Sequence, residues 1–256
     1  MNDYLQGVEW SLPQALYVFF GGLVGAFIAT AGVLVFQGDE LNILAFSASF
    51  AGQAGGNLFV MWILSVRKGT GSFIGDFGLT IEAKSWWGIP AGLALQTAVA
   101  LVTAPFLRLL FPDGPPQQSI ATLTSDTATV FEGVLIVLMV GVAAPVVEEM
   151  LFRGMLLSRL SRSMSPGWAI LVQAIVFASI HLLDPSAIAA LPGLVIVGAV
   201  LGYAAMRTGN LSLPIMIHAG VNLTAVVLLI FGGAALDWLE KAADPGVIRA
   251  VTSILG

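Results

Sequence analysis

Residues 129–158 read TVFEGVLIVLMVGVAAPVVEEMLFRGMLLS, a nearly unbroken apolar run. The run is longer than the roughly 20 residues that a helix needs to cross a hydrocarbon core of about 30 Å. It nevertheless contains four ionisable side chains: Glu132, Glu148, Glu149 and Arg153. A charge near the bilayer centre costs about 2.5–3.5 kcal/mol on insertion scales, so such groups usually face a protein interior or a water-filled cavity. The run therefore predicts a transmembrane helix that carries a polar site.

The composition of the whole chain is that of an integral membrane protein. Of the 256 residues, 57% are hydrophobic and 10% are charged, against about 25% charged in soluble domains. The mean hydropathy is +0.94. The net charge of −5 offers no basic surface of the kind that binds nucleic acid. Because the chain has no cysteine, disulfides, thiolate nucleophiles and cysteine metal sites are excluded.

Apolar windows between Gly, Pro and polar punctuation predict an all-α, polytopic transmembrane bundle of about seven to eight helices. We treat residues 1–256 as one multi-pass domain with its polar site in an intramembrane cavity. The last twenty or so residues mix apolar and charged side chains, which is typical of an interfacial helix and leaves open an eighth, partial crossing. The expected spans are 12–36, 43–66, 86–110, 129–158, 167–183, 187–206 and 213–233.

Basic residues predict the orientation of the bundle, because short cytoplasmic loops are enriched in Lys and Arg. They alternate with acidic loops, and Arg108 is the exception to the pattern. The first ten residues contain no Lys or Arg, so the first apolar run is expected to be a retained span. We therefore expect a multi-pass protein of the cell membrane with a cytoplasmic N-terminus. The short loops and the lack of cysteine suggest a bacterial source. The basic loop residues are Arg67, Lys68, Lys84, Arg159, Arg162 and Arg207.

The two adjacent glutamates have different expected surroundings. Residues four apart share a helix face, so Glu149 and Arg153 are expected to form an ion pair along one helix. Glu148 lies about 100° around the same helix, which leaves its carboxylate free to face other helices. Glu132 is too far along the helix to join them and is expected to be a polar start of the span. Pro145 is expected to kink the helix because it lacks an N–H.

Two further helices supply the remaining polar groups. His181 follows Phe177 by four residues, so the phenyl ring can pack beside the imidazole, and His218 and Asn222 are also four apart. A free carboxylate and a histidine can deprotonate a water molecule. A second histidine and an amide can donate hydrogen bonds to an oxyanion. This combination suits hydrolysis of a peptide bond without a serine or cysteine nucleophile.

Three ordered motifs carry a family resemblance. EEMLFR (Glu148–Arg153), FASIH (Phe177–His181) and HAGVN (His218–Asn222) resemble the EExxxR, FxxxH and HxxxN motifs of the CAAX protease and bacteriocin-processing family, also called CPBP or Abi. The resemblance covers about 128–230. The polar stretch GDFGLTIEAKSWWG (Gly75–Gly88) also looks like the family's segment ahead of the third helix, less diagnostically.

The resemblance implies an intramembrane glutamic endopeptidase that needs no cofactor or metal. Glu148 and His181 would activate water, while His218 and Asn222 would stabilise the oxyanion. Three residues would support them: Glu149, Arg153 and Phe177. The implied partners are a protein or peptide substrate at the membrane and the lipid bilayer itself.

Three alternatives stay open at the level of sequence. Glu148, His181 and His218 could form a zinc site with an open position for water, although the chain has no H-E-x-x-H motif and Asn222 would then have no evident role. The same residues could belong to a catalytically silent scaffold or bacteriocin-immunity protein. They could also form the proton relay of a transporter, although no internal repeat is visible.

Overall fold

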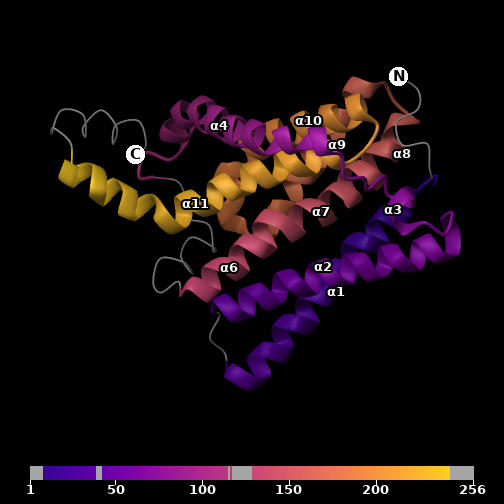
Figure 1. The fold of residues 1–256 in the computed structure, drawn as a ribbon, viewed down its shortest axis with the longest axis horizontal. Coiled ribbons are helices and arrows are strands. Elements are labelled where there is room, and N and C mark those ends of the chain that lie inside the picture. The colour runs from indigo at the N-terminus through magenta and orange to yellow at the C-terminus, as the bar shows by residue number, and fades with distance from the viewer. Residues whose placement is uncertain (1–7, 39–41, 115, 117–128, 243–256) are drawn as a thin grey trace.

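The computed structural model describes residues 8–38, 42–114, 116 and 129–242, which are helical with connecting loops and contain no strand (Figure 1). In this part of the chain, 6 helices are long and apolar enough to cross a membrane. They confirm the first six expected spans and the all-α polytopic fold. The six are Leu12–Phe36, Ile43–Lys68, Ala83–Leu110, Phe131–Ser161, Pro166–Leu183 and Pro185–Thr208.

The seventh expected span falls on α11 (Ser212–Ala242). The helix is confirmed and continues beyond the expected end at residue 233. Its apolar part among the residues searched, Ser212–Val227, is shorter than a span, so crossing by α11 stays a prediction. Of the expected C-terminal interfacial helix, the part up to Ala242 continues α11, and residues 243–256 lie outside the described residues.

Helix boundaries follow local capping chemistry. The Ser11 and Gln14 side chains form a capping box at the start of the first helix, and Asn42 accepts a hydrogen bond from the Ala45 N–H at the start of the second. Gly209 ends the helix Leu191–Thr208 with a φ of 71°, a left-handed conformation that favours glycine. Outside residues 130–161 and α11, the described elements are α1 (Leu12–Gln37), α2 (Ile43–Lys68), α3 (Phe73–Asp76), η1 (Ala83–Trp87), α4 (Gly88–Leu110), α9 (Pro166–Ile180), η4 (His181–Leu183), η5 (Pro185–Ala190) and α10 (Leu191–Thr208).

The helix that carries the glutamate pair, here called the motif helix, is a continuous span with two π-helical segments. It consists of α6 (Val130–Leu138), η2 (Met139–Ala143), α7 (Ala144–Glu149), η3 (Met150–Leu157) and α8 (Ser158–Ser161). The π-helical turn η2 lies just before Pro145, and a kink at this proline stays a prediction. Such turns widen the helix and occur frequently at functional sites. Glu132 closes a capping box with Thr129, which confirms it as a polar start of the span.

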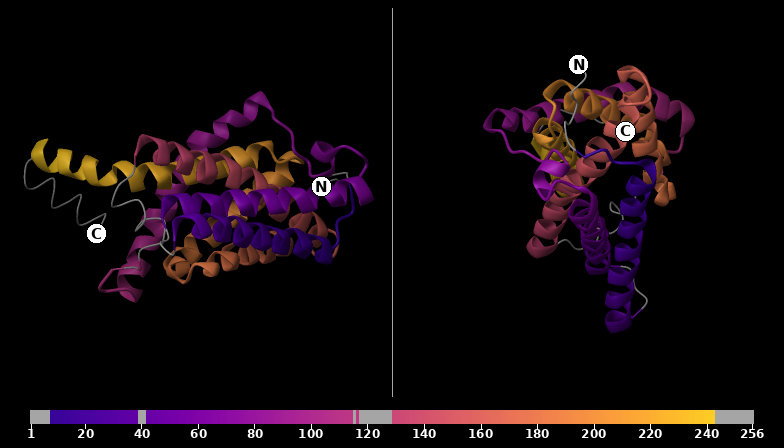
Figure 2. Two further views of the ribbon diagram at one scale, coloured as in Figure 1. Left: turned by 90° about the horizontal axis from the view of Figure 1, so that it is seen from below. Right: turned by 90° about the vertical axis from the view of Figure 1, so that its right-hand side faces the viewer.

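The bundle has two sides, with the motif helix between them. α1 and α2 lie against each other on one side, while α4, α9, α10 and α11 form the other (Figures 1 and 2). The motif helix contacts α1 and α2 through η3 and α7, and contacts α9, α10 and α11 through η3 and α7. The site residues on this helix therefore face elements from both sides.

Glycines allow close helix approaches that the sequence interpretation missed. A Cβ added at Gly52 would meet the carbonyl of Gly25, and one at Gly56 would meet the carbonyl of Gly21, so the backbones of α1 and α2 touch. The same arrangement joins α4 to α11, where a Cβ at Gly92 would meet the Ile217 carbonyl. Small residues pack transmembrane helices in this way because lipid provides no hydrophobic force between them.

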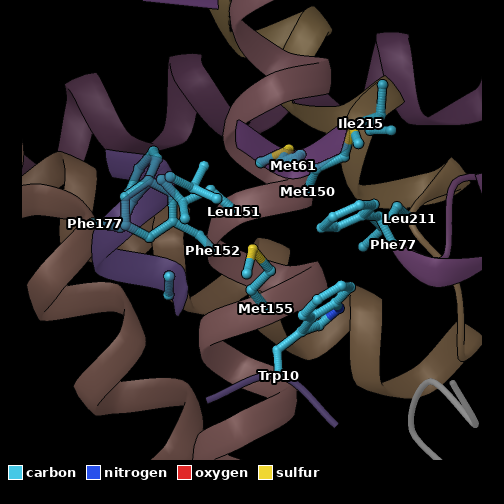
Figure 3. Packing of buried hydrophobic residues seen from close by; sticks show 12 residues of the cluster. Trp10, Met61, Phe77, Met150, Leu151, Phe152, Met155, Phe177, Leu211 and Ile215 are labelled. Atoms are coloured by element: carbon cyan, nitrogen blue, oxygen red, sulfur yellow. The ribbon is translucent and has the colours of Figure 1, made fainter. Parts of the chain in front are cut away.

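The main hydrophobic cluster surrounds η3. Met150, Phe152 and Met155 from this segment pack with residues of α1, α2, α9 and α11 and of the segment after α3 (Figure 3). Trp10 stacks on Phe77 with ring centroids 4.9 Å apart. The C-terminal half of the motif helix is thus enclosed on several sides, which fixes the position of the charged residues that it carries.

Polar contacts tie together the loops at one end of the bundle. Trp10 Nε1 donates to the Asp76 carbonyl at 3.1 Å, and Leu211 N donates to the Gly78 carbonyl at 3.1 Å. An ion pair joins Arg162 to Glu9 at 3.6 Å. The basic loop residues predicted to be cytoplasmic flank these same loops. The sequence and the fold therefore agree on one basic end, and its assignment to the cytoplasm stays a prediction.

Asp76 organises the loop between α2 and α4, outside the spanning segments. Its carboxylate accepts hydrogen bonds from the Ser65 hydroxyl and from the Thr70 N–H and hydroxyl. Burial alone would raise the pKa of Asp76, but these hydrogen bonds outweigh it and hold the pKa below its ordinary value of 3.8. The ionised carboxylate therefore stabilises the loop.

The Asp76→Asn variant is expected to unfold at a lower temperature than the wild type at pH 7. A depressed pKa contributes stability above the ordinary pKa that is lost as the pH falls through the folded-state value. The gap between the two proteins should therefore narrow in strong acid. Thermal unfolding in detergent between pH 7 and pH 3 measures this. The exposed Asp113→Asn control should follow the wild type, and a gap independent of pH would contradict the role of the charge.

The Gly52→Ala variant is expected to be less stable, although alanine favours a helix by about 1 kcal/mol over glycine. The added methyl would meet the Gly25 carbonyl and Ala29 Cβ, which are parts of a facing helix that cannot turn away. Gly55→Ala on the same helix is the matched control, because its methyl would meet nothing within 4 Å. Thermal unfolding should show a lower midpoint for Gly52→Ala and an equal or higher midpoint for Gly55→Ala. Equal midpoints for the two variants would contradict the close packing.

Candidate active site

The expected ion pair within the motif helix is present. Arg153 Nη1 lies 2.7 Å from Glu149 Oε1, and both side chains are 0% exposed. Two charges removed from water this completely are tolerated only with good geometry and further hydrogen bonds. The guanidinium meets this need through Nη2, which donates to the Gly198 carbonyl at 3.2 Å. It also lies 4.6 Å above the ring of Phe177, in a cation–π contact.

Glu149 has a second partner that spacing along one helix could not reveal. Nδ1 of His218, on α11, lies 2.8 Å from the same Oε1 that binds Arg153. A carboxylate accepts, so Nδ1 carries the proton and donates it. His218 is buried, and its other nitrogen, Nε2, lies 3.8 Å from Glu148 Oε2. Glu149 thus joins the EExxxR and HxxxN motifs and orients the imidazole toward Glu148.

Glu148 has the different surroundings that its position on the helix predicts. Its side chain is 26% exposed and lines a small cavity that is partly open to the outside. α1 contributes Phe19, α2 contributes Gln53 and Asn57, and the end of α9 contributes Ile180. The free carboxylate therefore faces a space between both sides of the bundle. The contribution of α2 to this space was not anticipated from the sequence.

His181 lies at the start of η4, one turn after Phe177. Its Nδ1 lies 2.8 Å from the Phe177 carbonyl, which can only accept, so Nδ1 carries the proton and a neutral ring keeps a lone pair on Nε2. The rings of Phe177 and His181 meet edge to face at 5.1 Å, which confirms the expected packing. Phe177 also meets the ring of His218 at 5.7 Å and therefore contacts both histidines. Within the described structure, no hydrogen bond joins His181 to Glu148.

Asn222 is held by the π-helical turn of the motif helix. In η2 the N–H of Ala144 donates to the Met139 carbonyl, five residues back. The next bond in this register would run from residue 145 to the Val140 carbonyl, but Pro145 has no N–H. Asn222 Nδ2 donates to this carbonyl instead, at 2.8 Å. One of the two amide hydrogens is thus used for positioning, and the second is left for another acceptor.

No group of three or more His, Cys, Asp or Glu side chains that could hold a metal ion occurs among the described residues. The three residues weighed as zinc ligands are Glu148, His181 and His218. Of these three side chains, two approach each other: His218 Nε2 lies 3.8 Å from Glu148 Oε2.

Arg153→Met and Glu148→Gln are expected to differ in stability. Removing Arg153 leaves the Glu149 charge buried without its cation, which typically costs about 3–5 kcal/mol of unfolding free energy. Glu148 faces the cavity, so Glu148→Gln should stay within about 0.5 kcal/mol of the wild type. Unfolding in mixed detergent micelles measures both variants. Equal destabilisation by the two changes would show that Glu148 is also a structural member of the ion-pair cluster.

Comparison with known proteins identifies the segment that carries the site. Residues 130–224 match the model of a protein family described as "Type II CAAX prenyl endopeptidase Rce1-like". Neither the curated proteins nor the solved structures contain a match to the chain. The matched segment contains all three motifs and agrees with the resemblance found in the sequence. Over residues 130–224, this chain is therefore similar to the Rce1-like family of type II CAAX prenyl endopeptidases.

Proposed function

We propose that this protein is an intramembrane glutamic endopeptidase that hydrolyses peptide bonds in membrane-associated proteins or peptides. The family supports a membrane endopeptidase of the CAAX protease type. The glutamic mechanism rests on one observation. Of the two adjacent carboxylates, Glu149 is buried and bound by Arg153 and His218, while Glu148 faces the cavity. Only Glu148 is therefore available to a water molecule and a substrate.

In the proposed mechanism, Glu148 and His181 activate the attacking water. The carboxylate of Glu148 accepts one water proton as a general base. Nε2 of His181, left with a lone pair by the bond from Nδ1 to the Phe177 carbonyl, accepts a hydrogen bond from the same water. After attack, the proton passes from Glu148 to the nitrogen of the leaving amine, so the carboxylate is regenerated.

His218 and Asn222 stabilise the negative oxygen that forms on the attacked carbonyl. The second amide hydrogen of Asn222 is available because the first is used by the Val140 carbonyl. Because Nδ1 of His218 donates to Glu149 Oε1, the ring donates from Nε2 in its doubly protonated form. Donors that are already oriented need no rearrangement during the reaction, which is the main source of such stabilisation.

We also propose that the reaction is independent of metal. In the metal-free mechanism each of the four catalytic side chains has a role, whereas a zinc site would leave the placement of Asn222 unused.

We further propose that the basic end of the bundle faces the cytoplasm. With Arg67, Lys68 and Arg162 on the cytoplasmic side, the N-terminus lies there too. The protein is then a multi-pass component of the cell membrane.

The Glu148→Gln and His181→Ala variants are expected to lose cleavage activity by about 100-fold or more, because a positioned acid or base contributes about 10²–10⁴ in rate. The assay uses the purified protein in lipid vesicles with an internally quenched peptide ending in a farnesylated CAAX sequence. Glu132→Gln is the matched control at the membrane edge and should retain full activity. Retention by Glu148→Gln or His181→Ala would contradict the assigned role.

Chelators provide the second half of this test. Excess EDTA or 1,10-phenanthroline should leave the rate unchanged in the proposed mechanism. Loss of activity together with loss of stoichiometric zinc would favour the metalloprotease. Absence of cleavage by the wild type, together with a cellular phenotype that Glu148→Gln still complements, would assign the protein to a silent scaffold or immunity role.

A further inference from the structure

Two amide side chains on α2 line the cavity opposite the motif helix, outside the segment that matches the family. Asn57 is 7% exposed, and its Oδ1 has no hydrogen-bond partner among the described residues. Gln53 lies one turn earlier on the same face of α2 and also lines the cavity. Their position beside Glu148 raises the question of what a polar pair does on a membrane-spanning helix.

The fold makes space for the Asn57 amide without satisfying it. A Cβ added at Gly22 of α1 would overlap the amide, so glycine at this position is what lets the side chain fit. A buried amide without a partner costs about 1–3 kcal/mol. Leucine has a similar size and would avoid the cost. Oδ1 lies against Gly22, and Asn57 also lines the cavity beside Glu148, so a peptide bound there could supply the missing partner once the amide turns away from Gly22.

The spacing of the two amides matches an extended peptide. Residues four apart on a helix are separated by about 6 Å along its axis. In an extended strand, N–H and C=O groups on the same edge recur every two residues, or about 6.8 Å. A side-chain amide both donates and accepts, so each one can pair with the backbone N–H and C=O of a strand that runs along α2.

The rest of the cavity wall complements such a strand. Its described residues include no Lys or Arg, so the lining provides no cation for a phosphate or a terminal carboxylate. Apolar side chains predominate and suit the apolar side chains of a membrane-associated peptide. They include Phe19, Phe50, Met139, Leu151, Phe152 and Ile180.

We infer that Gln53 and Asn57 bind the backbone of an extended peptide substrate and hold its scissile carbonyl against Glu148. This inference rests on the proposed peptidase function and specifies how its substrate is recognised. Because the two amides contact backbone groups, the recognition tolerates variation in substrate side chains. It also assigns part of the substrate site to α2, outside residues 130–224.

Binding to an inactive protein tests the inference separately from catalysis. The Glu148→Gln protein is titrated in detergent with a dansyl-labelled, farnesylated CAAX peptide, followed by fluorescence. Adding Asn57→Leu or Gln53→Met should weaken binding by about two- to tenfold each, the effect of losing one neutral hydrogen bond. Gln173→Met is the matched control, because Gln173 is also buried without partners but does not line the cavity. It should leave the affinity unchanged.

Ester substitutions in the peptide identify the contacted group and do not depend on the folding of a variant. Replacing one peptide N–H with an ester oxygen should weaken binding to the Glu148→Gln protein at one or two positions. At the position contacted by Asn57, the same ester should have no further effect once Asn57→Leu is present. Asn57→Leu should also unfold at an equal or higher temperature, since it removes an unpartnered amide.

The outcomes separate the two proposals. Unchanged affinity of both α2 variants, or ester effects that are independent of Asn57 and Gln53 at every position, would overturn the inference and leave the peptidase function standing. Ester coupling at Asn57 together with no cleavage by the wild type would overturn the peptidase function and support a peptide-binding site on α2. Failure of the Glu148→Gln protein to bind the peptide would also overturn the inference, while the peptidase function is decided by cleavage by the wild type.

Discussion

A single buried carboxylate oxygen connects the parts of this protein. Oε1 of Glu149 binds Arg153 along the motif helix and His218 from α11. Arg153 continues the network to the Gly198 carbonyl of α10 and the Phe177 ring of α9. Four elements are thereby fixed relative to one another in a region where an unpaired charge would be very costly. Close glycine contacts also join α1 to α2 and α4 to α11.

As a result, the neighbouring residues Glu148 and Glu149 have different surroundings and different proposed roles. Because Glu149 is held by two partners, it cannot approach a substrate. Glu148 lies about 100° around the same fixed helix, and its side chain lines the cavity. The π-helical turn before Pro145 adds a second positioning device, since the carbonyl that it leaves free binds Asn222. The polar groups of the site are thus already oriented when the protein is folded, as the proposed stabilisation of a transition state requires.

Much of the fold could be predicted from the sequence, because long apolar runs and residues four apart depend only on helix geometry. The first six spans, the pair of Glu149 with Arg153 and the packing of His181 on Phe177 are of this kind. The bond from His218 to Glu149 could not be predicted, because it joins two residues on different helices that are 69 positions apart in the chain. The glycine contacts and the amides of α2 were missed for the same reason, because they depend on residues of facing helices that are distant in the sequence.

In the proposed mechanism, a water molecule activated at Glu148, and not an enzyme nucleophile, attacks the peptide bond. A single turnover in H₂¹⁸O, with excess enzyme in lipid vesicles, tests this most directly. Mass spectrometry of the peptide product and of the Glu148-containing fragment locates the label. Direct attack by water predicts one ¹⁸O atom in the new carboxylate of the product and none in Glu148. Product without label, together with ¹⁸O in the carboxylate of Glu148, would show that this residue attacks the substrate itself and would contradict the account.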